Sequence, residues 1–479
     1  MGRIEMASLT KRAIILITCR IFNYGVMLLS PMFLVRIFDI HAYGQYREFM
    51  LYATLIGGLI EFSVNTNLIY FIPKYPLRER QSVTHTVLFI LMASSVGLLL
   101  VYAFKGVIIA RTSYNFLGLL IPFLFFFLNF DFFENYWLGK KRTDYVLIFS
   151  SARITVRTAA LLISAFISRD VEVVIKTLIA VEAAKCVFVS WMLRGVFTKH
   201  LDRDVIKEQL RYILPLGSAV AINVVNGQLA NLFISIKMGV ERLALYGIGS
   251  QQIPVINIVR SSAMDVLFPE MAQIGDAERL RLWQRANVAF CFLVFPTYVV
   301  FCFYAPAFID TLFTKGYAAA VPLFRIYLTV MVIQSFDIGT LLRAINQNKY
   351  AIYGNVLYLL ANLGLIFVLF RPLGFLAPAL AFVLGQMVVI LYLGMKAIHF
   401  YRIRPRELIA WKRVGVVFCC AVAATPPLIV STWIPMNPVV KAVSFSVVYL
   451  IVYYVAVRRF RLEEVELLVE KVRKRLRRS

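Results

Sequence analysis

The sequence contains little of what most enzymes use for catalysis or metal binding. Only 16% of its 479 residues are charged, and it has four histidines and six cysteines. No two cysteines have the CxxC spacing, so neither a disulfide framework nor a zinc site is indicated. The histidines are scattered, and no loop is long enough for a soluble domain. We therefore expect no metal, no cofactor and no enzymatic activity.

Long apolar runs are what the sequence does contain. Sixty per cent of the residues are apolar, and a helix needs about 20 predominantly apolar residues to cross a bilayer. The runs are continuous and lack the alternation of a β-barrel. We predict an all-α integral membrane protein with about 14 transmembrane helices, at residues 13–35, 48–72, 84–104, 114–138, 146–168, 171–195, 210–236, 243–269, 286–312, 321–344, 350–370, 374–399, 413–434 and 438–457.

Acidic residues are scarce, at 26 against 51 lysines and arginines. This excess invites a nucleic-acid interpretation, but the basic residues concentrate in alternate loops and in the tail after Arg458. That distribution is the positive-inside pattern of a multi-pass protein of the cytoplasmic (inner) membrane with both termini in the cytoplasm. The first span lacks a small-residue cleavage site, so we expect an anchor and not a removable signal peptide.

Several short marks recur in the same order about 200 residues apart. Six helices return the chain to the same side of the membrane, so the copies are expected to be parallel repeats, as in transporters that work by alternating access. The marks are Phe130-Asp131 and Phe336-Asp337 late in an apolar run, Tyr43-Gly44 and Tyr246-Gly247 opening a run, and the closing pairs Ile72-Pro73 and Phe268-Pro269.

The repeat predicts five segments. Residues 1–198 form an N-lobe of helices 1–6, residues 199–209 a cytoplasmic linker, and residues 210–400 a C-lobe of helices 7–12. Helices 13 and 14 follow at 401–457, outside the repeat. Residues 458–479 are predicted to be a basic amphipathic tail lying on the anionic inner leaflet, with a regulatory role left open.

Polar residues inside the predicted helices invite a functional interpretation, because ionisable groups are costly in a bilayer. Arg20 and Asn23 lie one turn apart on the first helix. A shift of 203 residues places them on Asn223 and Asn226 of the seventh helix. The polar face therefore recurs in both halves, while its charge does not.

Several of these groups are predicted to lie at a similar depth in the membrane. Arg20, Glu61 and Arg260 each lie roughly 12–17 Å from the cytoplasmic end of their helix, at 1.5 Å per residue. They are expected to share one cavity in the cytoplasmic half, or else Arg20 and Glu61 form an ion pair that joins helices 1 and 2. Asn65 is predicted to share a face of helix 2 with Glu61, and two further polar residues, Asn257 and Asp265, lie on helix 8.

Asp131 on helix 4 and Arg153 on helix 5 lie at the same depth, counted from the turn that joins the two helices. Asp131 is expected to neutralise Arg153, which leaves Arg157 as a candidate anion ligand, because a planar guanidinium binds phosphate oxygens bidentately. Asp337 is the counterpart of Asp131 in the other half, with Tyr358 and Asn362 near the positions equivalent to the two arginines. On helix 6, intrahelical pairs are predicted for Glu172 with Lys176 and for Glu182 with Lys185.

Three motifs taken in order carry a resemblance to a known family. They are Ala42-Tyr43-Gly44-Gln45-Tyr46, Ile72-Pro73-Lys74-Tyr75 and Leu214-Pro215-Leu216-Gly217. Over helices 1–12 the chain resembles the multidrug/oligosaccharidyl-lipid/polysaccharide (MOP) flippase superfamily, and more narrowly a Wzx-type polysaccharide transporter. Helices 13 and 14 match its fourteen-helix members.

The resemblance implies a function and a cavity. Such transporters flip undecaprenyl-pyrophosphate-linked oligosaccharide units across the cytoplasmic membrane by alternating access, for surface polysaccharide biosynthesis. Helices 1, 2, 7 and 8 would line the central cavity, which Arg20, Glu61, Asn223 and Arg260 would face. Partners would be the lipid-linked oligosaccharide, membrane lipids, H⁺ or Na⁺, and polysaccharide polymerase or glycosyltransferase machinery, with no nucleic acid.

The resulting site hypothesis combines cations with amides. Arginines would offset the cost of desolvating a diphosphate, and asparagines supply donors and acceptors for sugar hydroxyls. The predicted substrate-binding residues are Arg20, Asn23, Glu61, Asn65, Arg157, Asn223, Asn226, Asn257 and Arg260. The candidates for ion coupling are Glu61, Asp131 and Asp265.

Three alternatives remain. Lipid II flippases resemble this fold and are compatible with an arginine in helix 1 and another in helix 8, but their first helix is richer in arginine. Cation-coupled multidrug exporters typically have an acidic residue in helix 1 or 7, where this chain has Arg20 and asparagines. A membrane-embedded polysaccharide polymerase or ligase needs a catalytic loop or a helix-borne nucleophile and base. The loops of this sequence are short and its histidines are scattered, so this alternative is the least favoured.

Overall fold

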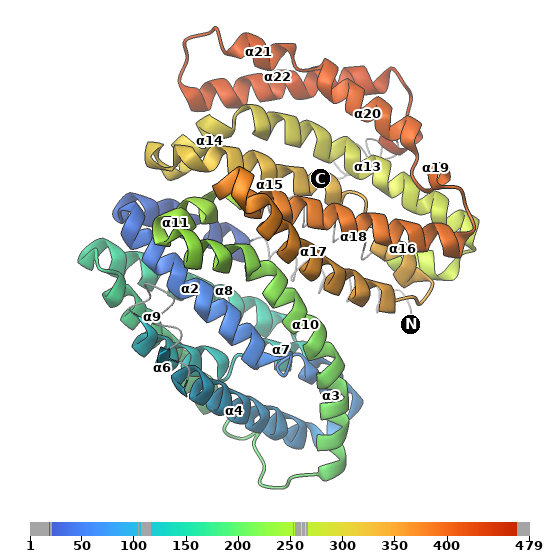
Figure 1. The fold of residues 1–479 in the computed structure, drawn as a ribbon. Coiled ribbons are helices and arrows are strands. Elements are labelled where there is room, and N and C mark those ends of the chain that lie inside the picture. The colour runs from blue at the N-terminus through green and yellow to red at the C-terminus, as the bar shows by residue number, and fades with distance from the viewer. Residues whose placement is uncertain are drawn as a thin grey trace. The chain divides into compact units, whose positions relative to one another are not determined.

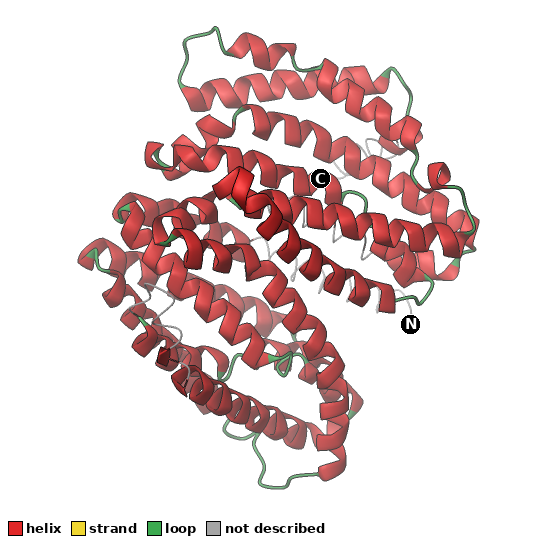
Figure 2. Cartoon of the chain, viewed as in Figure 1, coloured by secondary structure: helices red, strands yellow, loops and turns green. Residues whose placement is uncertain are grey.

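In the computed structural model, every described element of secondary structure is a helix (Figures 1 and 2). The structure describes residue 19 and residues 22–103, 105–106, 116–251, 253, 260, 264 and 267–466. The chain divides into two compact units, Met1–Ala244 and Leu245–Ser479. Each unit has buried apolar cores of its own.

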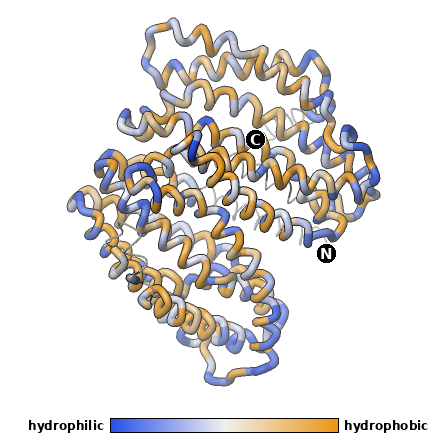
Figure 3. Tube along the Cα trace, viewed as in Figure 1, coloured by the Kyte–Doolittle hydropathy of each residue, from blue (hydrophilic) through white to orange (hydrophobic). Residues whose placement is uncertain are grey.

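The described helices are suited to a membrane. They include nine helical stretches that are long and apolar enough to cross a bilayer, and the longest of these, Lys349–Tyr401, is long enough for two spans. Figure 3 shows apolar residues running along the helices and polar residues at many of the loops. Large apolar side chains such as Leu99, Phe166 and Leu391 are exposed, as expected where lipid tails are the solvent. The predicted all-α membrane fold is confirmed.

The first unit begins, in its described part, with an apolar helix at Phe22–Ile37. Asp39 then caps the next helix, because its carboxylate accepts a hydrogen bond from the backbone N–H of Ala42 at 2.7 Å. The further elements are α2 (Ile40–Glu61), α3 (Asn67–Lys74), η1 (Pro76–Arg78), α4 (Glu79–Ala103), α6 (Leu117–Leu128), α7 (Phe133–Gly139), α8 (Thr143–Ser168), α9 (Val171–Met192), α10 (Arg203–Met238) and α11 (Val240–Gly249), which extends across the boundary between the units.

The second unit contains the remaining elements. Its helices are α13 (Asp276–Phe303), α14 (Ala305–Phe313), η2 (Lys315–Ala320), α15 (Val321–Gln334), α16 (Ile338–Ala344), α17 (Lys349–Leu373), η3 (Gly374–Leu376), α18 (Ala377–Tyr401), α19 (Pro405–Leu408), α20 (Trp411–Ala423), α21 (Pro426–Ser431) and α22 (Pro438–Arg458). The predicted helices 13 and 14 correspond to α20 with α21 and to α22.

Three spans that the sequence predicted as continuous are interrupted. Turns at 62–66, 129–132 and 335–337 separate α2 from α3, α6 from α7 and α15 from α16. Phe62, Ser63 and Phe130 adopt left-handed backbone conformations, with φ of 44°, 62° and 63°. Such angles are unfavourable for residues with a Cβ, so the surrounding structure must hold them. Hydropathy alone records an apolar run and does not register these turns.

Two of the interruptions carry the Phe-Asp mark of the repeat. At the first, the Asn129 side chain donates to the Phe125 carbonyl at 2.7 Å. At the second, the Trp283 indole N–H donates to the Asp337 carbonyl at 2.9 Å. Irregular backbone at membrane depth occurs where protein buries it or where it lines a cavity, and discontinuous helices often mark binding sites in transporters. The repeat mark therefore falls on the broken helix in each unit.

Helix α10 packs on α2 within the first unit. Gly217 of α10 lies so close to Phe62 that an added Cβ would overlap the ring, and a Cβ on Gly58 of α2 would lie 2.8 Å from a methyl carbon of Val224. The repeat assigns this helix to the second lobe, whereas compactness assigns it to the first unit. The predicted lobe boundaries, which rest on the repeat, stay a prediction.

The first turn of the predicted tail packs on the second unit. Glu463 forms an ion pair with Arg285 of α13 at 2.9 Å, and Glu464 pairs with Arg413 of α20. Val465 is buried in an apolar cluster formed by α13, α20 and α22. Residues 467–479 lie outside the described residues, so the placement of the tail on the inner leaflet stays a prediction.

Candidate functional site

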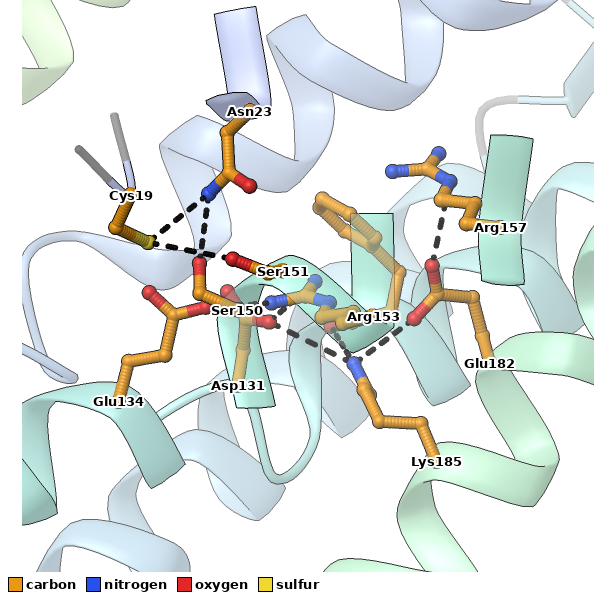
Figure 4. A network of polar contacts seen from close by, with 11 residues as sticks. Cys19, Asn23, Asp131, Glu134, Ser150, Ser151, Arg153, Arg157, Glu182 and Lys185 are labelled. Atoms are coloured by element: carbon orange, nitrogen blue, oxygen red, sulfur yellow. Dashed lines mark hydrogen bonds and ion pairs between the residues drawn. The ribbon is translucent and has the colours of Figure 1, made fainter. Parts of the chain in front are cut away.

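A network of charged side chains is centred on the interruption between α6 and α7 (Figure 4). The carboxylate of Asp131, within this turn, lies 2.6 Å from a guanidinium nitrogen of Arg153 on α8. This confirms the predicted ion pair. Lys185 of α9 approaches the same carboxylate oxygen at 3.6 Å. Asp131 therefore faces two cations from two helices.

Lys185 links the other parts of the network. Its ammonium group pairs with Glu182 at 2.9 Å, donates to the Phe127 carbonyl at 3.0 Å and approaches Asp131. Its side chain is 6% exposed and that of Glu182 is 2% exposed. The predicted intrahelical pair is correct, but the sequence did not indicate that Lys185 also neutralises the end of the broken helix. The carbonyl that it contacts is one that the end of α6 leaves without an intrahelical partner.

Arg157 is not the unpaired cation that the sequence suggested. Its Nε lies 3.5 Å from the Glu182 carboxylate, and its guanidinium lies 5.6 Å from the centre of the Phe127 ring. The expectation was wrong on this point because Glu182 accepts both Arg157 and Lys185, which periodicity along one helix does not reveal. Its role as a substrate ligand stays a prediction.

The network is balanced in charge. Glu134 of α7 lies 3.9 Å from Arg153, which adds a third carboxylate. Three acidic groups (Asp131, Glu134 and Glu182) face three basic groups (Arg153, Arg157 and Lys185). Buried charges persist when each has a partner, and removing one partner is costly. An anion that bound here would have to displace an existing carboxylate.

Asn23 lies at the edge of this network. Its side-chain amide donates to the Ser150 hydroxyl of α8 at 3.0 Å and contacts the Cys19 sulfur at 3.6 Å. Its carbonyl oxygen is buried and has no hydrogen-bond partner among the described residues. Arg20, its predicted neighbour, lies outside the described residues.

Glu61 and Asn65 lie together at the interruption between α2 and α3. Glu61 is the last residue of α2, and Asn65 is buried in the turn that follows. The Glu61 carboxylate accepts a hydrogen bond from the Asn65 side chain. The Asn65 carbonyl oxygen has no partner among the described residues. The predicted proximity is observed, although the turn and not a shared helix face produces it.

The two asparagines of α10 differ in environment. Asn223 is exposed and Asn226 is buried. They lie three positions apart on the helix, so they were expected to share a polar face. In the structure Asn226 points into the first unit, and only Asn223 is on the surface of that unit.

The second unit holds a smaller polar cluster at its own broken helix. Asp337 lies 3.6 Å from Arg260 and 3.7 Å from Arg343 of α16, and it accepts a hydrogen bond from the Thr340 hydroxyl at 2.8 Å. The Nε of Arg260 has no hydrogen-bond partner among the described residues. One carboxylate thus faces two guanidinium groups. Asn257 and Asp265, the predicted neighbours of Arg260, lie outside the described residues.

Tyr358 and Asn362 do not take part in this cluster. Both are buried, and the Asn362 amide donates to the Tyr358 hydroxyl at 3.4 Å. The repeat equivalents of Arg153 and Arg157 therefore form a neutral pair, while Arg260 and Arg343 face Asp337. The sequence did not indicate this role of Arg343. It lies at the end of its predicted span, where a basic residue is explained by the positive-inside rule.

Two carboxylates one residue apart, Asp202 and Asp204, invite comparison with metal-dependent transferases. Asp202 instead caps α10, where its carboxylate accepts from the backbone N–H of Asp204 at 2.9 Å and pairs with Arg78 at 2.9 Å. The Asp204 N–H holds the pKa of Asp202 below its usual value. Within the described ranges, no three side chains of His, Cys, Asp or Glu gather as metal ligands.

Comparison with known proteins identifies the family. Residues 33–322 match the family described as polysaccharide biosynthesis protein, which is more than half of the chain. The chain belongs to that family. It is a family of Wzx-type flippases within the MOP superfamily, so the protein is a multi-pass membrane protein of a flippase family. No curated protein matches the sequence.

Solved structures share the fold. The lipid II flippase MurJ in an inward-closed conformation superposes with a TM-score of 0.70 at 13% identity, over 95% of this chain and 100% of that one. An inward-facing multidrug resistance MATE family transporter gives 0.57 at 14% identity, over 81% and 95%. A MOP superfamily transporter from Pyrococcus furiosus gives 0.53 at 13% identity, over 84% and 96%. At these identities the likeness shows the fold alone.

Proposed function

We propose that the protein flips undecaprenyl-pyrophosphate-linked oligosaccharide units from the inner to the outer leaflet of the cytoplasmic membrane by alternating access, for surface polysaccharide biosynthesis. Family membership supports the lipid-linked class of substrate. The observation that carries the choice of an anionic head group is the unequal charge balance around Asp337, where, among the described residues, one carboxylate faces Arg260 and Arg343.

The cation excess suits a diphosphate. In the first unit each described basic group of the network has a carboxylate partner, so the described network offers no unpaired positive charge. In the second unit Arg260 is only weakly engaged, at 3.6 Å from Asp337, and its Nε is unpartnered among the described residues. A guanidinium keeps its charge at any relevant pH and binds phosphate oxygens through two parallel N–H groups. Arg260 would therefore move from Asp337 to the diphosphate when substrate binds.

The oligosaccharide would be held by amides. Asn223 is exposed on α10, and the carbonyl oxygens of Asn23 and Asn65 lack a partner among the described residues. These are hydrogen-bonding groups of the kind that sugar hydroxyls require. Amides can serve different sugars, because each has both donors and acceptors. The lipid tail would stay in the bilayer during the passage of the head group.

We also propose that both termini are cytoplasmic, on the basis of the loop charges.

Depletion of the protein tests this function. The expected result is accumulation of a lipid-linked oligosaccharide in the inner leaflet of the cytoplasmic membrane, with its sugars inaccessible to reagents added outside intact spheroplasts. Re-expression of the wild-type chain should clear it. Accumulation of lipid II, with arrest of cell-wall growth, would instead support the lipid II flippase alternative. If no lipid-linked sugar accumulates, the proposal is wrong.

A further inference from the structure

Glu48 is a buried carboxylic acid that no prediction from the sequence singled out. It lies in α2 with 2% of its surface exposed. It is eight residues after Ile40, the first residue of α2, which is about 12 Å along the helix. Its carboxyl group accepts a hydrogen bond from the Ser235 hydroxyl of α10. The side chain thus lies at the contact between α2 and α10, well inside the apolar part of the first unit.

Glu48 differs from Glu182 and Glu464, the other buried acids among the described residues, in having no cation. Glu182 lies within 4 Å of Arg157 and Lys185, and Glu464 pairs with Arg413. Among the described residues, Glu48 has no ion pair, and Ser235 is its hydrogen-bond partner. An isolated carboxylate in an apolar interior is so costly that the group stays neutral instead. This packing therefore favours the neutral, protonated form of Glu48.

The described parts of the helices around α2 offer no alternative counter-charge. On α2 itself, Arg47 precedes Glu48, and its charge interacts electrostatically with Tyr43 and Tyr46. On α10, Lys237 follows Ser235 but is exposed. None of these forms an ion pair with Glu48 within the described part of the chain.

The remaining neighbours of α2 are equally unsuited. Helix α6 contains no titratable residue in the sequence LGLLIPFLFFFL. On α9, Glu182 and Lys185 neutralise one another at 2.9 Å. On α4 the titratable groups of the apolar part are His85, which accepts from the Asp202 backbone N–H, and Tyr102, which is exposed beside Lys105. At the start of α11, Glu241 pairs with His41 at 3.6 Å.

Packing around Glu48 is too close to admit a hydrated charge. One turn before it, a Cβ added to Gly44 would overlap the Val240 carbonyl at the start of α11. Ser235 and Ile234 on α10 are buried as well. Ionisation therefore requires α2 and α10 to separate far enough for water to reach the carboxyl group.

We propose that Glu48 is a proton-binding site that couples protonation to the closure of α2 against α10. When the two helices separate, water reaches the carboxyl group, its O–H bond breaks, and the proton passes to water and leaves a carboxylate. The helices close again only after a proton is taken up from the compartment to which they opened. The link to substrate translocation rests on the proposed function, whereas proton binding by Glu48 does not.

Infrared difference spectroscopy in H₂O and D₂O tests the site on the purified protein. The wild type should show the carbonyl stretch of a protonated carboxylic acid near neutral pH. Glu48→Gln should lose that band, while Ser235→Ala should keep it at a shifted frequency because its hydrogen bond is gone. Glu241→Gln, which alters an exposed acid on α11, should leave the band unchanged. An identical band in wild type and Glu48→Gln would overturn the assignment.

Flipping in proteoliposomes tests the coupling. Glutamine mimics the protonated acid, retains a polar group beside Ser235 and cannot release a proton. If Glu48 couples closure to protonation, Glu48→Gln should lose the pH dependence of flipping and most of its rate, and Glu48→Asp should retain the pH dependence. If Glu48 has only a structural role, the pH dependence and the rate of flipping should both be unchanged in Glu48→Gln, and that result would overturn the coupling. If the infrared band behaves as expected but the wild type flips no lipid-linked oligosaccharide, the proposed function fails while the proton site stands.

Discussion

Replacing Arg260 with alanine is expected to reduce export of the lipid-linked oligosaccharide by roughly 30-fold or more. The pair that is lost is the one proposed between the Arg260 guanidinium and the diphosphate of the substrate. Removing one member of a buried, hydrogen-bonded charge pair typically costs about 2 kcal/mol or more, and each 1.4 kcal/mol is about a factor of ten. Arg260 is 27% exposed and only 3.6 Å from Asp337, so it is engaged loosely enough to turn to a diphosphate. Export is measured as surface polysaccharide per cell, normalised to the amount of protein in the membrane.

Two further variants separate charge from geometry at this position. Arg260→Lys keeps the charge but loses the planar fork, so an intermediate loss is expected. Arg371→Ala removes an exposed arginine from the end of α17 of the same unit and should export normally. Export at the wild-type level by Arg260→Ala would show that the substrate anion is recognised elsewhere.

Replacing Lys185 with methionine is expected to cause the largest loss of stability, about 3 kcal/mol or more, the usual cost of breaking a buried ion pair. Methionine has nearly the same length, so the change removes charge and leaves packing. It would leave Glu182 with Arg157 alone, Asp131 with Arg153 alone, and the Phe127 carbonyl without its donor. The measurement is the free energy of unfolding in detergent, together with the midpoint of thermal unfolding.

The same helix provides a matched control for this prediction. Lys176 also pairs with a glutamate of α9, Glu172 at 2.8 Å, but its side chain is 59% exposed. An exposed i,i+4 pair is worth about 0.3–0.5 kcal/mol, so Lys176→Met should be close to neutral. Equal effects of the two substitutions would mean that Lys185 is not the centre of a buried network.

Patterns within one helix were predictable from the sequence. The apolar runs predicted membrane helices, and the i,i+3 and i,i+4 spacing predicted the pairs of Glu182 with Lys185 and Glu172 with Lys176, both of which the structure contains. Equal depth from a shared turn predicted the pair of Asp131 with Arg153 across two helices. In each case the chain itself fixes the distance between the partners.

Contacts between helices far apart in the sequence were not predictable in this way. Lys185 reaches Asp131, and Arg260 reaches Asp337, but no sequence spacing sets the rotation of one helix against another. The interruptions were missed for a different reason. Phe62, Ser63 and Phe130 are ordinary members of an apolar run, and their left-handed backbone is imposed by packing. Glu48 was overlooked because one acid at the start of a span reads as a boundary residue.

The most direct test of the proposed function is flipping by the purified protein. Liposomes would carry undecaprenyl-pyrophosphate-linked oligosaccharide in both leaflets, and the fraction of sugar accessible to a membrane-impermeant glycosidase would be followed over time. The account predicts that vesicles with wild-type protein expose nearly all of the sugar, that vesicles with Arg260→Ala expose the inner-leaflet fraction roughly 30-fold more slowly, and that vesicles without protein expose only the outer-leaflet fraction. An accessible fraction that the wild-type protein leaves at the level of protein-free vesicles would contradict it.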